Sequence, residues 1–512
     1  MAQRTYHSWL IAALLLISYV YVLPRWADWS QNSRLNLLLA LGDDGTVRID
    51  RYVQNTGDYA LYEGHTYSDK APGPVFLALP AFLAVRPLID HPLVASRAQA
   101  LGGGAAMGDT LNTQGTGLRD DKIRFALVQY LMTIIVVALP AAALGALLFA
   151  ALRGMGLGST PAALTALAYG LGSAAAPYAG NFYSHQLVAT LLFGAFCVAW
   201  RPWEQQPLAL SAQPFALVRR TGWGSGLLCG LLLGWAVISE YPTVLPGAVI
   251  GLYALRRHGW RWLPALLVGG ALPGALLVAY DLAAFGTPLP VGYAYSVLWQ
   301  DQHHTGFMSL TFPRFEALWG LGFSFFRGLF VRAPWLLLAA PGFILWWRTG
   351  RLRAEWWVTL LAALSVYLFY STSIMWWGGF AAGPRYIVPL IPFLALAAGW
   401  AIARAFASAA LRLAVCALVA ISIMLTWAEA TAGQSFPSDA VRNTWGGIVL
   451  PAWQSGDIAR NLGMAIGLAG PLSLLPLAAL ILLGGALLFL PPLSRPTGRP
   501  VVTQPGQLNT EG

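Results

Sequence analysis

The chain has 512 residues, of which 57% are hydrophobic and only 10% are charged. Soluble domains carry about 25% charged residues, so this composition excludes a chain of soluble domains. Several almost uncharged stretches reach the ~20 residues that are needed to cross a bilayer. The sequence therefore predicts an all-α, polytopic transmembrane helical bundle.

Apolar stretches follow one another along the chain and predict about 11 to 13 spans. Residues 72–88 are also apolar but contain four prolines and Arg86, so we expect a re-entrant or interface-lying helix there. The predicted spans cover, in chain order, about residues 8–24, 124–151, 160–178, 186–200, 224–239, 242–255, 263–285, 328–347, 355–371, 384–403, 412–428 and 466–490.

Basic residues gather in alternate loops. With the N-terminus inside, one set of loops holds 15 cations and three acids, and the other set holds 16 cations and 18 acids. This asymmetry follows the positive-inside rule. The net charge of +10 therefore indicates orientation and gives no reason to expect a nucleic-acid partner. We expect a multi-pass protein of the plasma (cytoplasmic) membrane with both termini cytoplasmic.

The loops predict how the chain is organised. Residues 1–492 are expected to form one membrane domain, with a long, partly helical first outer segment at 25–123 and further outer segments at 286–327 and 429–465. Residues 493–512 are expected to be a disordered cytoplasmic tail. We expect no intramembrane charge that would serve an ion-coupled carrier as a relay. Any chemistry should therefore take place at the outer membrane boundary.

The first outer segment carries most of the candidate chemistry. It contains Thr56-Gly-Asp58-Tyr, then His65, and then Tyr67-Ser-Asp69-Lys70-Ala-Pro-Gly-Pro at the start of an apolar helix. Proline is favoured at a helix start, and free N–H groups there, with Lys70 just before them, make an anion site. The alternative is an ion-paired loop that folds on itself.

These motifs resemble those of a known superfamily. Tyr67-Ser-Asp69-Lys70-Ala-Pro-Gly resembles the Y-x-D-K-P-P element of the GT-C superfamily of lipid-carrier-dependent glycosyltransferases, which includes aminoarabinose lipid A transferases and protein O-mannosyltransferases. Gly-Asp58-Tyr is similar to their G-D-W. Arg385-Tyr386-Ile-Val-Pro-Leu-Ile-Pro resembles the R-Y-x-x-P-x-x-P that opens a late span, and His185 lies at an outer turn where the family has a polar residue.

The sequence departs from the superfamily at one place. An acidic pair followed by x-Arg is usual shortly after the first span, but here the stretch reads Gln31-Asn-Ser-Arg34. The arginine is kept and the acids are missing. Asp50 is our first substitute for the catalytic base, with Asp28, Asp58 and Asp69 behind it.

The resemblance implies a role for each matching residue. Lys70, Arg385 and Tyr386 would bind the donor phosphate, and Asp50, Asp58 and Asp69 would be the catalytic carboxylates. Asp58 could instead be structural, because a Gly-Asp turn often bonds its own backbone. The remaining substrate-binding candidates are Arg34, His65, Tyr67, His185, Glu240 and Tyr241. A turn residue at position 185 and an interface anchor at 240–241 are the alternatives.

The implied reaction transfers a sugar from a polyprenyl-phosphate donor to a hydroxyl of a lipid, glycan or protein acceptor, by a single inverting displacement. No cofactor is expected. Asp301, His303 and His304 could bind a divalent metal, although adjacent histidines rarely share one ion. Two rival interpretations remain: a transporter or flippase for lipid-linked saccharides, and a non-catalytic assembly protein.

Overall fold

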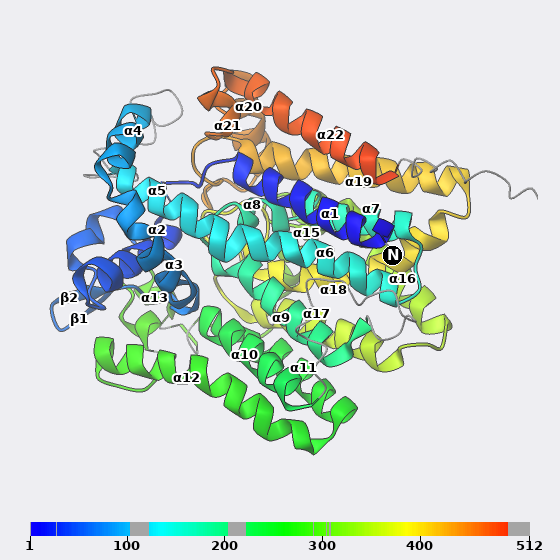
Figure 1. Ribbon diagram of the computed structural model, residues 1–512, viewed down its shortest axis with the longest axis horizontal. Coiled ribbons are helices and arrows are strands. Elements are labelled where there is room, and N and C mark those ends of the chain that lie inside the picture. Colours follow the sequence, from blue (N-terminus) through cyan, green and yellow to red (C-terminus); the bar gives the residue numbers. More distant parts are fainter. Residues whose placement is uncertain are drawn as a thin grey trace, which may run out of the picture.

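The computed structural model describes residues 2–26, 28–102, 122–202, 222–289, 291–303, 305–306 and 309–489. The predicted tail at 493–512 lies outside the described residues. The rest is almost entirely helical, with one two-stranded hairpin in the part described (Figure 1). The expected all-α, multi-pass membrane architecture is confirmed.

The elements follow the apolar stretches of the sequence. The helices are α1 (Ala2–Tyr21), α2 (Trp29–Leu39), α3 (Gly73–Ile89), α4 (Pro92–Gly102), α5 (Lys122–Thr133), α6 (Leu139–Gly154), α7 (Ser159–Leu171), α8 (Ala175–Ala179), α9 (Ser184–Trp200), α10 (Trp223–Ser239), α11 (Val244–His258), α12 (Leu263–Phe285), α13 (Gln300–His303), α14 (Phe315–Phe323), α15 (Leu329–Arg332), α16 (Ala339–Arg348), α17 (Arg353–Thr372), α18 (Ile391–Ala405), α19 (Ala409–Thr431), α20 (Leu450–Ser455), α21 (Leu462–Ala465) and α22 (Leu475–Phe489). The strands are β1 (Ala60–Tyr62) and β2 (His65–Tyr67).

Fewer helices than expected are long enough to span a membrane by themselves. Six described helices pass a test of length and hydropathy, or seven if the bent pair α3–α4 is one span. Three others, including α9 and α10, are apolar but have at most 17 residues. The predicted span at 328–347 is divided into α15, a 3-10 turn at Pro334–Leu338 and α16. Proline at the start of this turn cannot continue the hydrogen-bond ladder of an α-helix.

Small residues bring neighbouring helices into close contact. A Cβ on Gly230 of α10 would lie 2.1 Å from the Leu266 carbonyl oxygen of α12, and one on Gly269 would lie 2.1 Å from the Leu227 oxygen. Close backbone approach at small residues is the usual packing mode of membrane helices. The core lies around α6, α7, α9 and α18, whereas α12, α19 and α22 expose apolar side chains at the edges of the bundle (Figure 1).

Two buried carboxylates lie near the ends of apolar helices. Asp281 lies within the apolar segment Trp260–Phe285, only 1% exposed and about one turn before the end of α12. Glu429 is likewise buried near the end of α19. Both carboxylates lie close to the ends of their helices. The middle parts of α12 and α19 contain no charged residue.

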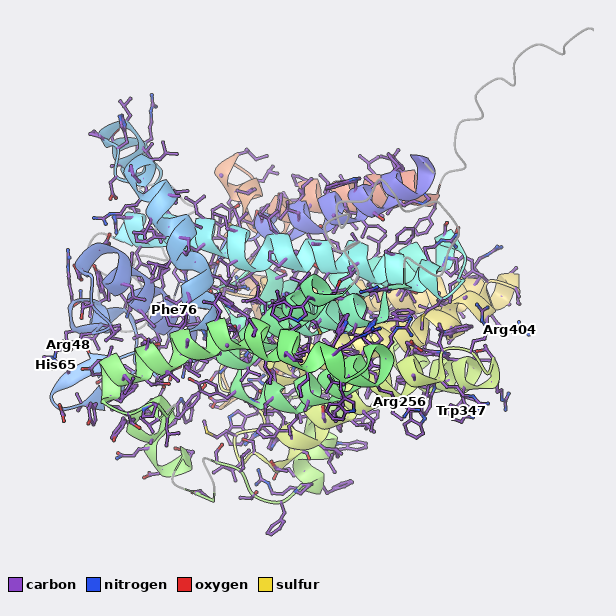
Figure 2. All side chains as sticks on the ribbon, turned by 60° about the horizontal axis from the view of Figure 1, so that its bottom comes forward. Arg48, His65, Phe76, Arg256, Trp347 and Arg404 are labelled. Atoms are coloured by element: carbon purple, nitrogen blue, oxygen red, sulfur yellow. The ribbon has the colours of Figure 1, made fainter. Side chains whose placement is uncertain are left out.

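The two ends of the bundle carry different loops. Arg256 and Arg404, from predicted inner loops, and Trp347, the last residue of a predicted span, lie at one end, and Arg48 and His65, from the first outer segment, lie at the other (Figure 2). Helices α3 and α4 meet at 91° beside this second end. The first outer segment thus forms a cap of α2, β1, β2, α3 and α4 on one end of the bundle (Figure 1).

Arg48 and Arg404 lie at opposite ends of the bundle (Figure 2). This placement predicts that reagents reach them from opposite sides of the membrane. In a protein whose three cysteines are replaced by alanine, we expect a membrane-impermeant maleimide to label Arg48→Cys on intact cells. Arg404→Cys should react only after the membrane is opened, because arginine-rich loops stay inside. Both side chains are exposed, so access alone decides the outcome. Labelling of both from the same side would contradict this arrangement.

Candidate active site

A cavity of about 360 Å³ lies at the end of the bundle that the first outer segment caps. Its walls come from α2, from the chain before α3, from the outer ends of α9, α10, α11 and α17, and from the 3-10 turn η11 (Arg385–Leu390). The ionisable side chains of the lining are Arg34, Asp58, Lys70, His185, Glu240 and Arg385. Most other lining side chains are apolar or aromatic, including Tyr241, Val244, Tyr293, Trp299, Leu310, Phe369, Tyr370, Met375 and Tyr386.

Helix α2 is built from polar residues that are nevertheless buried. Asp28 caps it by accepting a hydrogen bond from the Gln31 amide, at 3.1 Å. Asn32 Nδ2 donates to the carbonyl oxygens of Trp26 and Asn55, at 2.8 and 2.9 Å. Buried polar groups require such partners. The amides at the place of the missing acids therefore fix α2 against the chain around it.

The hairpin β1–β2 leads into the cavity. Its register pairs Ala60 with Tyr67 and Tyr62 with His65. The backbone then turns at Ser68, whose Oγ lies 2.9 Å from Ser33 Oγ of α2. Asp69 and Lys70 follow directly, so the hairpin and α2 together place these two residues.

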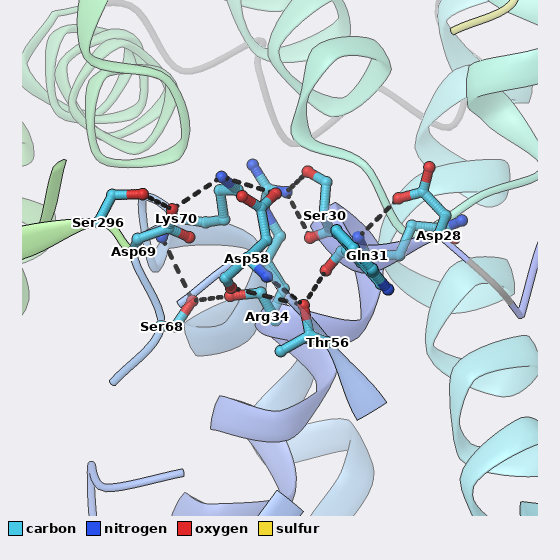
Figure 3. A network of polar contacts seen from close by, with 12 residues as sticks. Asp28, Ser30, Gln31, Arg34, Thr56, Asp58, Ser68, Asp69, Lys70 and Ser296 are labelled. Atoms are coloured by element: carbon cyan, nitrogen blue, oxygen red, sulfur yellow. Dashed lines mark hydrogen bonds and ion pairs between the residues drawn. The ribbon is translucent and has the colours of Figure 1, made fainter. Parts of the chain in front are cut away.

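Lys70 joins two carboxylates at the base of the cavity (Figure 3). Its Nζ lies 2.9 Å from Asp58 Oδ2 and 3.1 Å from Asp69 Oδ2, and Ser296 Oγ donates to Asp69 Oδ2 at 2.9 Å. Burial opposes the charge on Lys70, but the two carboxylates raise its pKa above the usual value. Burial also raises the pKa of Asp69. Lys70 is therefore a cation held by two carboxylates of the first outer segment, and one of these accepts a hydrogen bond from the second outer segment.

Arg34 and Glu240 form a second ion-paired group in the cavity lining. Arg34 Nη2 donates to Ser184 Oγ at 2.9 Å and lies 3.6 Å from Glu240 Oε1. The Ser184 hydroxyl donates to the same oxygen, and His185 Nδ1 lies 3.3 Å from it. Burial raises the pKa of Glu240. Residues of α2, α9 and the end of α10 thus meet at one carboxylate.

Arg385 stands at the start of η11 and faces the cavity without a carboxylate. No described carboxylate lies within 4 Å of it, and Nη1 donates to Tyr183 Oη at 3.2 Å. The Tyr183 hydroxyl in turn donates to Asp28. Gly378 has φ +73°, and a Cβ there would lie 3.0 Å from Arg385 Nε. Glycine at 378 therefore leaves room for the arginine.

A buried ion pair supports the chain that leads to Arg385. Arg332 Nε and Nη2 donate to the two oxygens of Glu429, at 2.5 and 2.9 Å, and both side chains are at most 4% exposed. Glu429 also accepts a hydrogen bond from the Gly383 amide, at 3.3 Å. Arg327 donates to the carbonyl oxygens of Trp377 and Gly379. Hydrogen bonds with these buried side chains thus fix the backbone of the segment before Arg385.

The cavity brings together most, but not all, of the residues that the sequence singled out. Eight line it: Arg34, Asp58, Lys70, His185, Glu240, Tyr241, Arg385 and Tyr386. Asp69 is buried behind Lys70. Tyr67 is buried against Phe285, with ring centroids 5.2 Å apart. Neither side chain is part of the lining, so both support the site from outside it.

Asp50 and His65 lie outside the cavity. Asp50 accepts hydrogen bonds from the Thr66 amide at 2.6 Å, from Thr66 Oγ1 at 2.7 Å and from His65 Nδ1 at 2.9 Å. Although slight burial opposes the effect, these bonds lower the pKa of Asp50. Neither residue is part of the cavity lining. Asp50 therefore connects 3-10 turn η2 (Asp50–Asn55) to β2, and its predicted role as the base stays a prediction.

The metal candidates do not form a site in the part that the structure describes. Asp301 and His303 lie in or beside the short helix α13, and His304 lies outside the described residues. Within the described ranges, no three His, Cys, Asp or Glu side chains are grouped so as to hold a metal ion.

Several lining residues were missed by the sequence interpretation. Tyr293, Trp299 and Leu310 come from the second outer segment, and Tyr370 stacks on Tyr386 with ring centroids 4.8 Å apart. The aromatic residues of that segment were the available signal, but aromatic side chains are common at any membrane interface.

Comparisons with known proteins give distant structural neighbours only. No protein-family model and no curated protein matches the sequence. The chain is similar to the crystal structure of ArnT from Cupriavidus metallidurans bound to undecaprenyl phosphate, with 17% identity and a TM-score of 0.46, over 94% of this chain and 75% of that one. It is also similar to the archaeal oligosaccharyltransferase AglB from Archaeoglobus fulgidus in complex with an inhibitory peptide and a dolichol-phosphate, with 11% identity and a TM-score of 0.44, over 83% of this chain and 56% of that one.

Replacing Asp50 tests its place outside the cavity. We expect Asp50→Asn to keep the activity that the resemblance implies within threefold of the wild type, because the carboxylate contacts only the hairpin among the described residues. The variant should lose about 1 kcal/mol of stability with the charge-assisted bonds. Turnover and thermal unfolding in detergent would be measured together. A loss of activity of 100-fold without unfolding would return Asp50 to the site.

The effects of replacing Arg332 and Glu429 on the free energy of unfolding should not add. Glu429→Leu or Arg332→Met leaves one charge buried without its partner, which costs about 3–5 kcal/mol. We expect the double variant to be more stable than either single variant, because no uncompensated charge remains. Denaturant unfolding in mixed micelles of the wild type and the three variants measures the coupling. Destabilisations that simply add would show that the two side chains act independently.

Proposed function

We propose that this protein is an integral membrane glycosyltransferase. It transfers a sugar from a polyprenyl-phosphate-linked donor to an acceptor hydroxyl at the outer face of the membrane. The observation that carries the proposal is the composition of the cavity: three cations and two carboxylates share its walls with aromatic and aliphatic side chains. Such a site suits a ligand that is anionic at one end and apolar at the other.

The cations suit the phosphate of the donor. Lys70 and Arg34 each have carboxylate partners, whereas Arg385 has none within 4 Å among the described residues. Arg385 also presents a planar guanidinium, which binds phosphate oxygens in pairs. The phosphate therefore binds first at Arg385, and Lys70 and Arg34 stabilise the charge that gathers on it as the sugar leaves.

Exposed apolar side chains next to the cavity support a place for the lipid tail at the membrane face. Val244, at the start of α11, lines the cavity and is 53% exposed. Phe369 lines it from the end of α17, beside the exposed Leu368. Helices α11 and α17 pack against each other. The tail can therefore lie in the bilayer while the phosphate and sugar occupy the cavity.

The reaction is a single displacement at the anomeric carbon. The acceptor oxygen forms its bond to that carbon as the bond to the phosphate oxygen breaks, and the electron pair leaves with the lipid phosphate. The acceptor hydroxyl must lose its proton, so a carboxylate in the cavity can act as general base. Asp58 and Glu240 are the two carboxylates in the lining. A direct displacement inverts the configuration of the sugar.

The position of the cavity favours an enzyme over a carrier. A flippase requires a polar path through the bundle, whereas the residues that line this cavity lie in outer segments or at the outer ends of helices. We place the protein in the plasma membrane with both termini cytoplasmic, since Arg256 and Arg404, from predicted inner loops, lie at the end opposite Arg48 and His65 (Figure 2).

Replacement of Arg385 tests the phosphate site. We expect Arg385→Ala to lower the release of lipid phosphate from a polyprenyl-phosphate sugar by about 10- to 100-fold, because a charged hydrogen bond is worth about 1.5–3 kcal/mol. Binding of undecaprenyl phosphate should weaken similarly. No described carboxylate loses a partner within 4 Å in this variant. Purified protein in nanodiscs and radiolabelled donors provide the assay.

Arg48→Ala is the matched control, since Arg48 is exposed at the same end of the bundle and outside the lining. It should turn over donor like the wild type. Equal activity of both variants would contradict a phosphate site at Arg385. Movement of intact donor across vesicles, without release of lipid phosphate, would favour the flippase.

A further inference from the structure

The two carboxylates of the cavity are bound in different ways. Asp58 Oδ2 lies 2.9 Å from Lys70 Nζ, and its other oxygen, Oδ1, is buried and accepts no hydrogen bond from a described residue. Among the described residues, the ion pairs and side-chain hydrogen bonds of Glu240 all go to Oε1. No described side chain contacts Glu240 Oε2, and this oxygen is not among the buried, unpartnered atoms. Of the two carboxylates that line the cavity in the described part of the chain, Glu240 is therefore the one whose unpartnered oxygen is open to a ligand.

The neighbours of Glu240 hold it in one orientation. Ser184 and His185, at the start of α9, contact Oε1, and the Arg34 guanidinium lies 3.6 Å away. The imidazole of His185 is itself packed between Tyr183 and Tyr386, at 5.8 and 5.6 Å between ring centroids. A general base must point at the proton that it takes. With Oε1 fixed from three sides, the direction of Oε2 is fixed as well.

We infer that Glu240 is the general base that accepts the proton of the acceptor hydroxyl, and that Asp58 is a positioning residue for Lys70. This inference rests on the proposed glycosyl transfer. The acceptor O–H donates its proton to Glu240 Oε2 while the oxygen attacks the anomeric carbon. The carbon–phosphate oxygen bond breaks, and lipid phosphate leaves with the electron pair. Atoms and charge are conserved without a further reactant.

The environment suits Glu240 for this task. Burial raises its pKa, while Arg34, Arg385 and Lys70 oppose the rise and keep the ionised form accessible. A carboxylate of raised pKa is a stronger base when it is ionised. Asp58 is poorly suited, because protonation of its oxygen beside the Lys70 ammonium would remove the ion pair that holds this cation in place.

An anionic acceptor can show whether Glu240 acts as a base or only binds the acceptor. Azide attacks the anomeric carbon without a proton to lose, so it does not need a base. We expect Glu240→Ala to lower transfer to the hydroxyl acceptor by at least 100-fold. With sodium azide in place of that acceptor, the same variant should form the inverted glycosyl azide within about threefold of the wild-type rate. Asp58→Ala should lose both reactions, because Lys70 is displaced.

Controls make each outcome decisive. Glu316→Ala, an exposed glutamate of α14 outside the lining, should perform both reactions like the wild type. Glu240→Gln keeps the size of the side chain and replaces the alanine variant if that variant does not fold. Loss of azide transfer in folded Glu240→Gln would overturn the inference and assign Glu240 to binding. Azide transfer kept by Asp58→Ala, with hydroxyl transfer lost, would overturn it in favour of Asp58. If the wild type releases no lipid phosphate with either acceptor, the proposed function itself fails, and the inference fails with it.

Discussion

The ion pairs of Lys70 with Asp58 and Asp69 are the interaction on which the outer end of the molecule depends. The chain has few charges, and it buries three of them here, at 2.9 and 3.1 Å. Buried charges are tolerated only when they are paired and hydrogen-bonded. Asp58 precedes the hairpin and Lys70 follows it, and Ser296 of the second outer segment donates to Asp69. This one cluster therefore fixes where two outer segments meet and where the cavity begins.

The three cations of the cavity differ in how many carboxylate partners they have. This difference favours one of them as the binding place of an anion. Lys70 has two carboxylates, Arg34 has one at 3.6 Å, and Arg385 has none within 4 Å among the described residues. An incoming anion gains most at Arg385, where it competes with no carboxylate among the described residues. The free oxygen of Glu240 belongs to the wall formed with Arg34. In the proposed reaction, the phosphate and the acceptor are thus drawn to different groups, as a displacement at the sugar between them requires.

Much of the fold could be predicted from the sequence because apolar stretches form helices in a membrane. The alternation of arginine-rich loops also indicated the two ends that Figure 2 shows. Apolar stretches such as residues 328–347 are divided at prolines into shorter helical pieces, which hydropathy does not reveal. Within the site, Lys70 and Arg385 were found from their motifs. The pairing of Arg332 with Glu429 could not be predicted from the sequence. The two residues are 97 positions apart, and either one alone resembles an interfacial charge.

Asp50 and α2 show why local chemistry misled the interpretation of the first outer segment. Asp50 stands among acids and cations in the sequence, but the register of the hairpin turns its carboxylate to the Thr66 amide. The amides of α2 occupy the place where acids were expected, and Asn32 donates two hydrogen bonds to carbonyl oxygens. An aspartate at this position could only accept, and it would face two acceptors in a buried site. The local backbone thus favours amides over acids in α2. An acid for proton transfer is therefore best supplied by another element, and the end of α10 is where the cavity has one with a free oxygen.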